Sequence, residues 1–272
     1  MSTMNVSNLT KETLRKMFLE DKRFDGRKLF DLRNFEVSFD VSNKSEGSAR
    51  VKIGKTEVIA GIKMDIGSPY PDSLDAGNLI VSGDLLPVAS PRFESGPPKF
   101  NAIELPRLID RMIRESGMID LKGLCIKEGE KVWNLFIDIY PINDDGSLID
   151  AASIACVAAL YNAKIPGIKE GDLADHKNKS DKKLPLKEGT TPLTFTTHKL
   201  GESLILDPTR EEEESCDGKI VFGISKWNGK YMINSCQKGL EMTFTRKEIE
   251  NIVDALPNKY EEVMEKLKNY LK

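Results

Sequence analysis

The chain has 272 residues, which is long enough for one large domain or two modest ones. It carries 40 basic and 43 acidic side chains, so it has no global positive field to attract nucleic acid. Its four cysteines lie far apart and it has only two histidines, which argues against a zinc site and a disulfide framework, and we expect no metal and no cofactor. No apolar run has the length of a bilayer span and the N-terminus lacks the apolar core of a signal peptide, so we expect no membrane contact and a cytoplasmic protein.

The chain is expected to begin with a helical extension over residues 1–23, followed by a first half over residues 24–170. Alternation in "FEVSFDV" predicts a strand, and "ARVKIGKTEVIAGIKMDI" predicts a hairpin that turns at Gly54-Lys55. Residues 68–99 contain six prolines and are expected to form a long loop. A loop of this length inside a compact domain is more often functional than idle.

Two helices are expected in the rest of the first half. Apolar residues in "IELPRLIDRMIRES" recur at helical spacing over residues 103–116, and Gly117 closes that helix. Strands at "GLCIK" and "KVWNLFIDIYPI" follow. The alanine-rich segment "LIDAASIACVAAL" predicts a second helix at the centre of a packed layer, because alanine favours helix and its small side chain lets a neighbouring backbone approach closely.

The second half is expected to repeat the order of hairpin and helix. A charged connector over residues 171–190 reads as a solvated linker, and the second half covers residues 191–272. Strand-like "PLTFTTHKL" and "SLILD" precede an acidic run, and Asn228-Gly229 predicts the turn of a second hairpin. This order of elements predicts an α+β fold.

The C-terminal segment is expected to be helical. Thr245 and Glu248 form a capping box that opens it. Pro257 is expected to break it into two helices, because proline removes a hydrogen bond from a helix interior.

Three arginines share one face of the first of the two helices predicted in the first half. Arg107, Arg111 and Arg114 stand at i, i+4 and i+7, opposite the apolar face. Guanidinium suits phosphate because its planar fork donates two parallel hydrogen bonds, so the row predicts contact with an RNA backbone. The alternative is a solvated face in which Asp110 and Glu115 pair with the arginines.

A second group of candidate residues is the acidic stretch "LDPTREEEESCDG". Clustered carboxylates can hold a divalent cation or shift one another's pKa for acid–base work. Asp207 follows the strand-like segment and is the best placed of them. An acidic run is more often a solvated loop, and that alternative stays open.

The third candidate is the turn "DDGSLID" before the alanine-rich helix. Helix N-termini attract anions because free N–H groups and the macrodipole point there. Asp150 in the first turn would complete that positive end from within and repel a bound phosphate. Alternatively, Asp150 is an ordinary first-turn acid.

Taken in order, several segments resemble the RNase PH family, and within it the non-catalytic RNase PH-type subunit of the archaeal exosome. The resemblance covers residues 24–250 and is carried by "FDGRKLFDLRNFEV", "GSARVKIGKTEVIAGI", "SPRFESGPPKFNAIELPRLIDRMIRES", "KVWNLFIDIYPINDDGSLIDAASIACVAAL" and "LDPTREEE". It implies an RNase PH-like fold of two βαβα-type halves with helices packed between two sheets. It also implies a hexameric ring of three heterodimers with a catalytic RNase PH-type subunit, joined by RNA-binding cap proteins.

The resemblance also assigns the site residues. Active members cleave RNA from its 3′ end by phosphorolysis and hold phosphate with a Gly-Gly-[Thr/Ser]-Arg turn, which corresponds here to "DGSLIDAAS". Ser147 and Asp150 are therefore expected to mark a degenerate phosphate site, in which Asp150 occupies or neighbours the place of the arginine. Asp207 and Glu213 are expected to mark a degenerate acidic site. We expect that Asp150→Arg leaves folding nearly intact without restoring phosphorolysis.

The arginines gain a role from the same resemblance. Arg107 and Arg111 match positions that hold RNA in the family, and Arg114 matches less well. The expected function is a non-catalytic ring subunit that positions RNA and helps structure the partner's active site for 3′-to-5′ degradation. The alternatives are an active phosphorolytic exoribonuclease that uses other cations such as Lys219, and a metal-dependent hydrolase that uses the cluster around Asp207.

Overall fold

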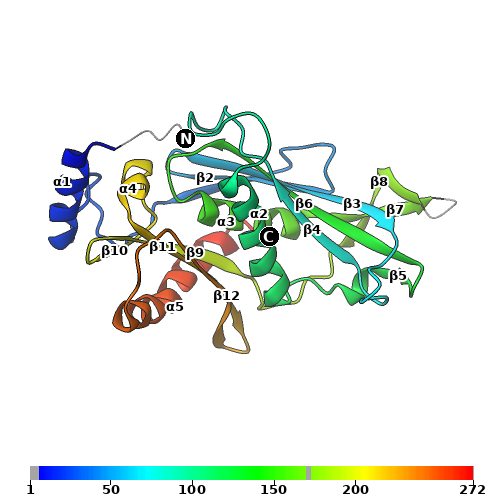
Figure 1. Ribbon diagram of the computed structural model, residues 1–272. Coiled ribbons are helices and arrows are strands. Elements are labelled where there is room, and N and C mark those ends of the chain that lie inside the picture. The colour runs from blue at the N-terminus through cyan, green and yellow to red at the C-terminus, as the bar shows by residue number, and fades with distance from the viewer. Residues whose placement is uncertain (1–5, 170–172, 272) are drawn as a thin grey trace.

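The computed structural model describes residues 6–169 and 173–271 (Figure 1). Residues 1–5 of the predicted extension, residues 171–172 of the predicted connector and residue 272 lie outside the described residues. Within the described part of the chain, no helix is long and apolar enough to cross a membrane.

The first sheet contains the two strands of the predicted hairpin near its centre. Its order is β1-β2-β3-β6-β4, with β5 paired to β6. The strands are β1 (Phe35–Phe39), β2 (Gly47–Ile53), β3 (Thr56–Gly67), β4 (Asn78–Gly83), β5 (Cys125–Lys127) and β6 (Lys131–Asn143). Every second residue of β3 from Thr56 to Met64 is buried, so the sheet turns one face to the core. All pairings are antiparallel except that of β4 with β6.

The second sheet is a smaller antiparallel unit with the order β10-β9-β11-β12. Its strands are β9 (Leu193–Leu200), β10 (Ser203–Leu206), β11 (Gly218–Trp227) and β12 (Lys230–Gly239). Asn228 and Gly229 have φ angles of 47° and 78°, the left-handed values that a type I′ turn requires. The second predicted hairpin is therefore confirmed.

The two long helices of the first half lie between these sheets (Figure 1). The helices of the chain are α1 (Asn8–Leu19), α2 (Phe100–Ser116), the short 3₁₀ helix η1 (Lys122–Leu124), α3 (Leu148–Asn162), α4 (Arg210–Ser215) and α5 (Arg246–Lys268). A Cβ added to Gly47 of β2 would lie 2.5 Å from the Cα of Ala163, so α3 meets the first sheet almost backbone to backbone. The other side of α3 faces β9. The expected α+β fold with helices between two sheets is thus confirmed.

The N-terminal helix docks on the second half. Leu14 and Phe18 are buried with Leu200 and Ile205 in a small apolar cluster separate from the main core. Lys11 Nζ lies 2.5 Å from a carboxylate oxygen of Asp217. The extension is therefore held by apolar burial, with an ion pair at its edge.

Helix α5 corrects the prediction at Pro257. It runs unbroken from Arg246 to Lys268 with Pro257 inside it, and its capping box at Thr245 is present as predicted. Proline costs one backbone hydrogen bond there. Leu256 and Tyr260, on either side, are buried against the rest of the protein, and burial of this kind stabilises by about 1.5 to 3 kcal/mol for each large side chain. Tertiary packing therefore outweighs the local preference for a break.

Two segments that were expected to be irregular contain strands. Within residues 68–99, β4 pairs in parallel with β6, and the prolines flank this strand without entering it. Within residues 171–190, β8 (Leu173–Lys183) pairs with β7 (Lys164–Lys169). The segment expected to be a solvated connector is therefore largely exposed but forms a strand, because pairing with β7 satisfies its backbone while an outer strand can carry charged side chains.

Candidate functional site

The turn before α3 is held tightly against the second half of the chain. Gly146 has a φ of 85°, and a Cβ added to it would lie 2.4 Å from the carbonyl oxygen of Pro208. Ser147 follows in the left-handed region with a φ of 57°. Only glycine permits the close approach at position 146, so the backbone of this turn is fixed by its contact with the segment that leads into α4.

An internal carboxylate occupies the N-terminus of α3. The backbone N–H of Ser147 donates to Oε2 of Glu213 at 3.0 Å. Burial by itself raises the pKa of Glu213, but His198, Arg92 and the Ser147 N–H outweigh it and hold that pKa below its ordinary value. The position where a helix N-terminus binds an anion is therefore filled by a side chain of α4.

The cations around Glu213 are already engaged by carboxylates. Arg92, in the segment before α2, places Nη2 2.6 Å from Oδ2 of Asp144 and 3.8 Å from Oε1 of Glu213. Lys219 on β11 donates from Nζ to Oε2 of Glu104 at 2.7 Å. Neither cation is left unpaired in the described structure.

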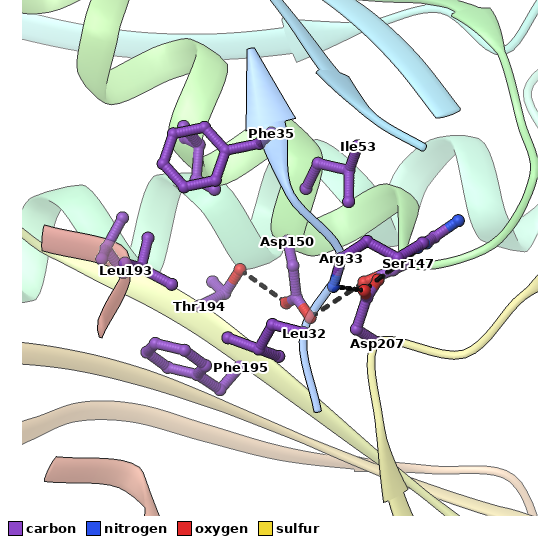
Figure 2. A pocket seen from close by; sticks show the side chains of 12 residues that line it. Leu32, Arg33, Phe35, Ile53, Ser147, Asp150, Leu193, Thr194, Phe195 and Asp207 are labelled. Atoms are coloured by element: carbon purple, nitrogen blue, oxygen red, sulfur yellow. Dashed lines mark hydrogen bonds and ion pairs between the residues drawn. The ribbon is translucent and has the colours of Figure 1, made fainter. Parts of the chain in front are cut away.

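Asp150 is directed toward β9, as Figure 2 shows. Its carboxylate accepts hydrogen bonds from the Thr196 N–H at 3.0 Å, Thr196 Oγ1 at 2.8 Å and Thr194 Oγ1 at 3.0 Å. Burial raises the pKa of Asp150 to about 6, against the lowering effect of the bonds from Thr196 and Thr194. Asp150 therefore joins α3 to the second sheet, while Glu213 supplies the negative charge at the helix N-terminus.

Asp207 lies in the same region and is clamped by arginines. It has a left-handed backbone with a φ of 46° and is buried. It accepts from the Arg33 backbone N–H at 2.6 Å, from Arg33 Nη2 at 2.7 Å and from Arg27 Nη1 at 3.0 Å. Burial alone would raise the pKa of Asp207, but Arg33 outweighs burial and lowers it.

Arg33 also connects the turn before α3 to the second half. Its guanidinium donates to the carbonyl oxygens of Asp145, Gly146 and Pro208, each at 3.2 Å. Together with Ser147, Asp150 and Asp207, it lines a cavity of about 30 Å³ (Figure 2). This space holds about one water molecule.

The structure thus brings the two predicted degenerate sites together. Ser147 bonds to Glu213, and the side chain of Arg33 reaches from Asp207 to the turn that carries Ser147 and Asp150. The contacts of Arg33 with Asp207 and with the turn before α3 were not predicted from the sequence. That arginine stood in the quoted segment "FDGRKLFDLRNFEV", but nothing local indicated a partner 174 residues away.

The acidic stretch after Asp207 is a helix, so the alternative of a solvated loop was wrong. Thr209 and Glu212 form a capping box that opens α4. Glu212 is buried and accepts from Arg23 Nε at 2.9 Å, and Glu214 accepts from Arg210 Nε at 3.0 Å. Over residues 6–169 and 173–271, no group of three or more His, Cys, Asp or Glu side chains is placed to hold a metal ion.

The arginine face of α2 divides into two kinds of residue. Arg114 donates to Asp110 at 2.7 Å and to the carbonyl oxygen of Leu79 at 3.0 Å. Arg107 and Arg111 are exposed, and the described residues offer them no ion pair and no side-chain hydrogen bond. The expected pairing with Asp110 is therefore present for Arg114 and absent for Arg107 and Arg111, which are exposed to solvent.

Comparison with known proteins agrees with this architecture. The model for domain 1 of the 3′ exoribonuclease family (RNase PH) matches residues 31–166, and that for domain 2 matches residues 190–255. The chain is 39% identical over 264 residues to the exosome complex component Rrp42 of Methanothermobacter thermautotrophicus, covering 96% of this chain and 95% of the relative. It is 42% identical over 271 residues to Rrp42 of Pyrobaculum aerophilum, covering 98% and 96%.

Solved structures show the same likeness in three dimensions. A chain of the Archaeoglobus fulgidus exosome with RNA bound to the active site superposes with a TM-score of 0.87 at 38% identity, covering 95% of this chain and 98% of that one. A chain of an archaeal exosome core gives a TM-score of 0.83 at 34% identity, covering 96% and 97%. With two sheets enclosing α2 and α3 and both domain models matched in order, this chain belongs to the RNase PH family of 3′ exoribonucleases.

Proposed function

We propose that this chain is a non-catalytic ring subunit of an exosome, which positions RNA and helps structure the active site of a catalytic RNase PH-type partner during 3′-to-5′ degradation. Near full-length identities of 39% and 42% to Rrp42 proteins and the TM-score of 0.87 to a chain of an RNA-bound exosome support this placement. In the proposed assembly, three heterodimers form a hexameric ring that RNA-binding cap proteins join.

The bond from the Ser147 N–H to Glu213 carries the non-catalytic part of the proposal. A phosphate at the start of α3 would have to displace this carboxylate or lie beside it. Two unit negative charges about 4 Å apart repel by about 4 kcal/mol at an effective dielectric constant of about 20. The α3 N-terminus therefore favours its internal carboxylate over inorganic phosphate.

The two alternative activities find less support in the same region. A phosphorolytic site built on Lys219 would have to take that lysine from Glu104, which lies 2.7 Å from its Nζ. A metal site around Asp207 would compete with Arg33 and Arg27 for the same carboxylate. Forming either site would therefore require breaking a buried or partly buried ion pair, which costs free energy.

A product assay tests the proposal. The full chain, a catalytic RNase PH-type partner and their mixture are each incubated with labelled RNA, with and without phosphate and with and without EDTA. We expect no nucleoside diphosphate from the chain alone, and phosphate-dependent release by the mixture in a complex with the mass of three heterodimers. Phosphate-dependent release by the chain alone would favour the phosphorolytic alternative. EDTA-sensitive cleavage without phosphate would favour the hydrolase.

The unpaired arginines of α2 give a second prediction. The double variant Arg107→Ala/Arg111→Ala should bind single-stranded RNA more weakly in the reconstituted ring. The slope of log K against log salt concentration should become shallower by about 1.4, because each lost phosphate contact accounts for about 0.7. Arg246→Ala on α5 is the matched control, since Arg246 is exposed but pairs with Glu250. A slope equal to that of the wild type would indicate that the two arginines do not contact phosphates.

A further inference from the structure

We propose that Phe100 stacks on a base of the bound RNA and extends the Arg107–Arg111 pair into a track for single-stranded RNA along α2. This inference rests on the proposed function, because it concerns the same RNA-binding face. Phe100 is the first residue of α2, and 70% of its surface is exposed. Phe100 would thereby contact a base on the same helix whose arginines are proposed to contact the RNA backbone.

Helix geometry places the three side chains in one line. At 100° per residue, Phe100, Arg107 and Arg111 fall within an arc of roughly 40°. A rise of 1.5 Å per residue separates Phe100 from Arg107 by about 10 Å along the axis, and Arg107 from Arg111 by about 6 Å. The opposite face of α2 packs into the core through Leu105, Leu108, Ile109, Met112 and Ile113. Glu104, which borders the line, is buried and paired with Lys219.

The chemistry of the line fits a single strand better than a duplex. Proteins that bind single-stranded nucleic acid combine cations that follow the backbone with aromatic rings on which the bases stack. Arg107 and Arg111 supply two cations that the described residues leave unpaired. A lone exposed phenylalanine needs no explanation by itself. Phe100, however, lies in line with two unpaired cations, so it supplies the aromatic surface on which a base of a single strand could stack.

The N-terminal end of α2 adjoins a hollow in the surface. A hollow of about 180 Å³ lies there, lined by Arg92, Phe93, Lys99, Asn101 and Ala102 among others. It lies between the start of the helix and the segment before it. Phe100 does not line this hollow, although its neighbours Lys99 and Asn101 do, so the hollow lies beside the proposed stacking position.

The test separates base contacts from backbone contacts. The full chain and its ring with the catalytic partner are titrated with an oligoadenylate and with an abasic oligoribonucleotide of the same length. We expect Phe100→Ala to weaken oligoadenylate binding roughly 5- to 150-fold, as for the loss of one stacked base, with abasic binding and the salt slope unchanged. Phe100→Trp should retain oligoadenylate binding, because it keeps an aromatic face.

Two controls make the outcomes distinct. Phe24→Ala removes a phenylalanine that is 53% exposed in the turn after α1, and it should change neither titration. Arg107→Ala/Arg111→Ala should weaken binding of both oligonucleotides. Equal oligoadenylate affinity of Phe100→Ala and wild type, or an equal loss on both oligonucleotides, would overturn the inference.

Failure of the proposed function would have a different signature. If the wild-type chain does not assemble with the catalytic partner, the ring proposal fails, while the two titrations of the chain alone still decide the role of Phe100. If Phe100→Ala instead prevents assembly and leaves oligoadenylate binding by the chain unchanged, the aromatic side chain of Phe100 contacts a protein partner and the stacking role is wrong.

Discussion

Asp150→Arg is expected to destabilise the chain by about 3 kcal/mol or more, as measured by urea unfolding at pH 7. The cavity beside Asp150 measures about 30 Å³, which is too small for an arginine side chain. The substitution also removes the acceptor of the Thr196 N–H and brings a second guanidinium close to Arg33. The sequence alone suggested that folding would stay nearly intact, and the contacts of Asp150 with β9 are the reason to reverse that expectation.

Asp150→Asn is the matched control, because the amide keeps the shape and can still accept from the Thr196 N–H. Burial raises the pKa of Asp150 from its ordinary value of 3.8 to about 6, so the folded chain holds this proton more tightly than the unfolded chain. The contribution of this bound proton to the free energy of unfolding is fully present below about pH 4 and is lost as the pH rises through about 6.

The Asp150→Asn variant cannot ionise at this position, so its free energy of unfolding does not fall for this reason as the pH rises. The free energy of unfolding of Asp150→Asn minus that of the wild type should therefore grow with pH between about 4 and 7, by at most about 3 kcal/mol. Urea titrations at several pH values give this difference directly. A difference independent of pH would show that Asp150 titrates normally in the folded chain, and stability of Asp150→Arg close to that of Asp150→Asn would contradict the packing argument.

Arg33→Ala is expected to cost about 3 to 5 kcal/mol of unfolding free energy, the range for removing one partner of a buried ion pair. Asp207 would remain buried with Arg27 as its remaining side-chain cation. The carbonyl oxygens of Gly146 and Pro208 would lose their shared donor as well. Arg27→Ala should cost less, because Arg33 would still bond to Asp207 through both its side chain and its backbone.

A second substitution separates charge from packing at this clamp. Asp207→Asn removes the negative charge while tolerating the left-handed backbone of that position, which asparagine adopts readily. In the Arg33→Ala background it should recover part of the lost stability. If the double variant were as unstable as the sum of both single variants, the buried charge of Asp207 would not be the main cost.

Elements with local signals were predicted well from the sequence. The alanine-rich segment predicted α3, the Asn228-Gly229 pair predicted the hairpin of β11 and β12, and Thr245 with Glu248 predicted the start of α5. In each case the residues that determine the structure are neighbours in the chain. Helix propensity, turn geometry and capping need no distant partner to act.

Elements that depend on distant partners were missed. β4 lies between groups of prolines, and it is a strand because β6, about 55 residues later, pairs with it. The unbroken course of α5 through Pro257 depends on the core that buries Leu256 and Tyr260. Local preference favoured a loop and a break at these places, and tertiary contacts overrode both.

The candidate site shows the same division. The family resemblance drew attention to Ser147, Asp150, Asp207 and Glu213, and these four residues do meet in space. Their partners did not follow from the sequence, because Arg33 and Asp207 are 174 residues apart and Ser147 and Glu213 are 66 apart. The pairings therefore required the folded chain.

The burial of α3 ties the two matched family domains together. Eleven of the residues of α3 are buried, with the first sheet on one side and β9 on the other. Pulling the domains apart would expose to water the side of this apolar helix that faces β9, so neither half retains a complete core alone. Local opening at the interface between α3 and β9 is therefore expected to weaken both domains at once.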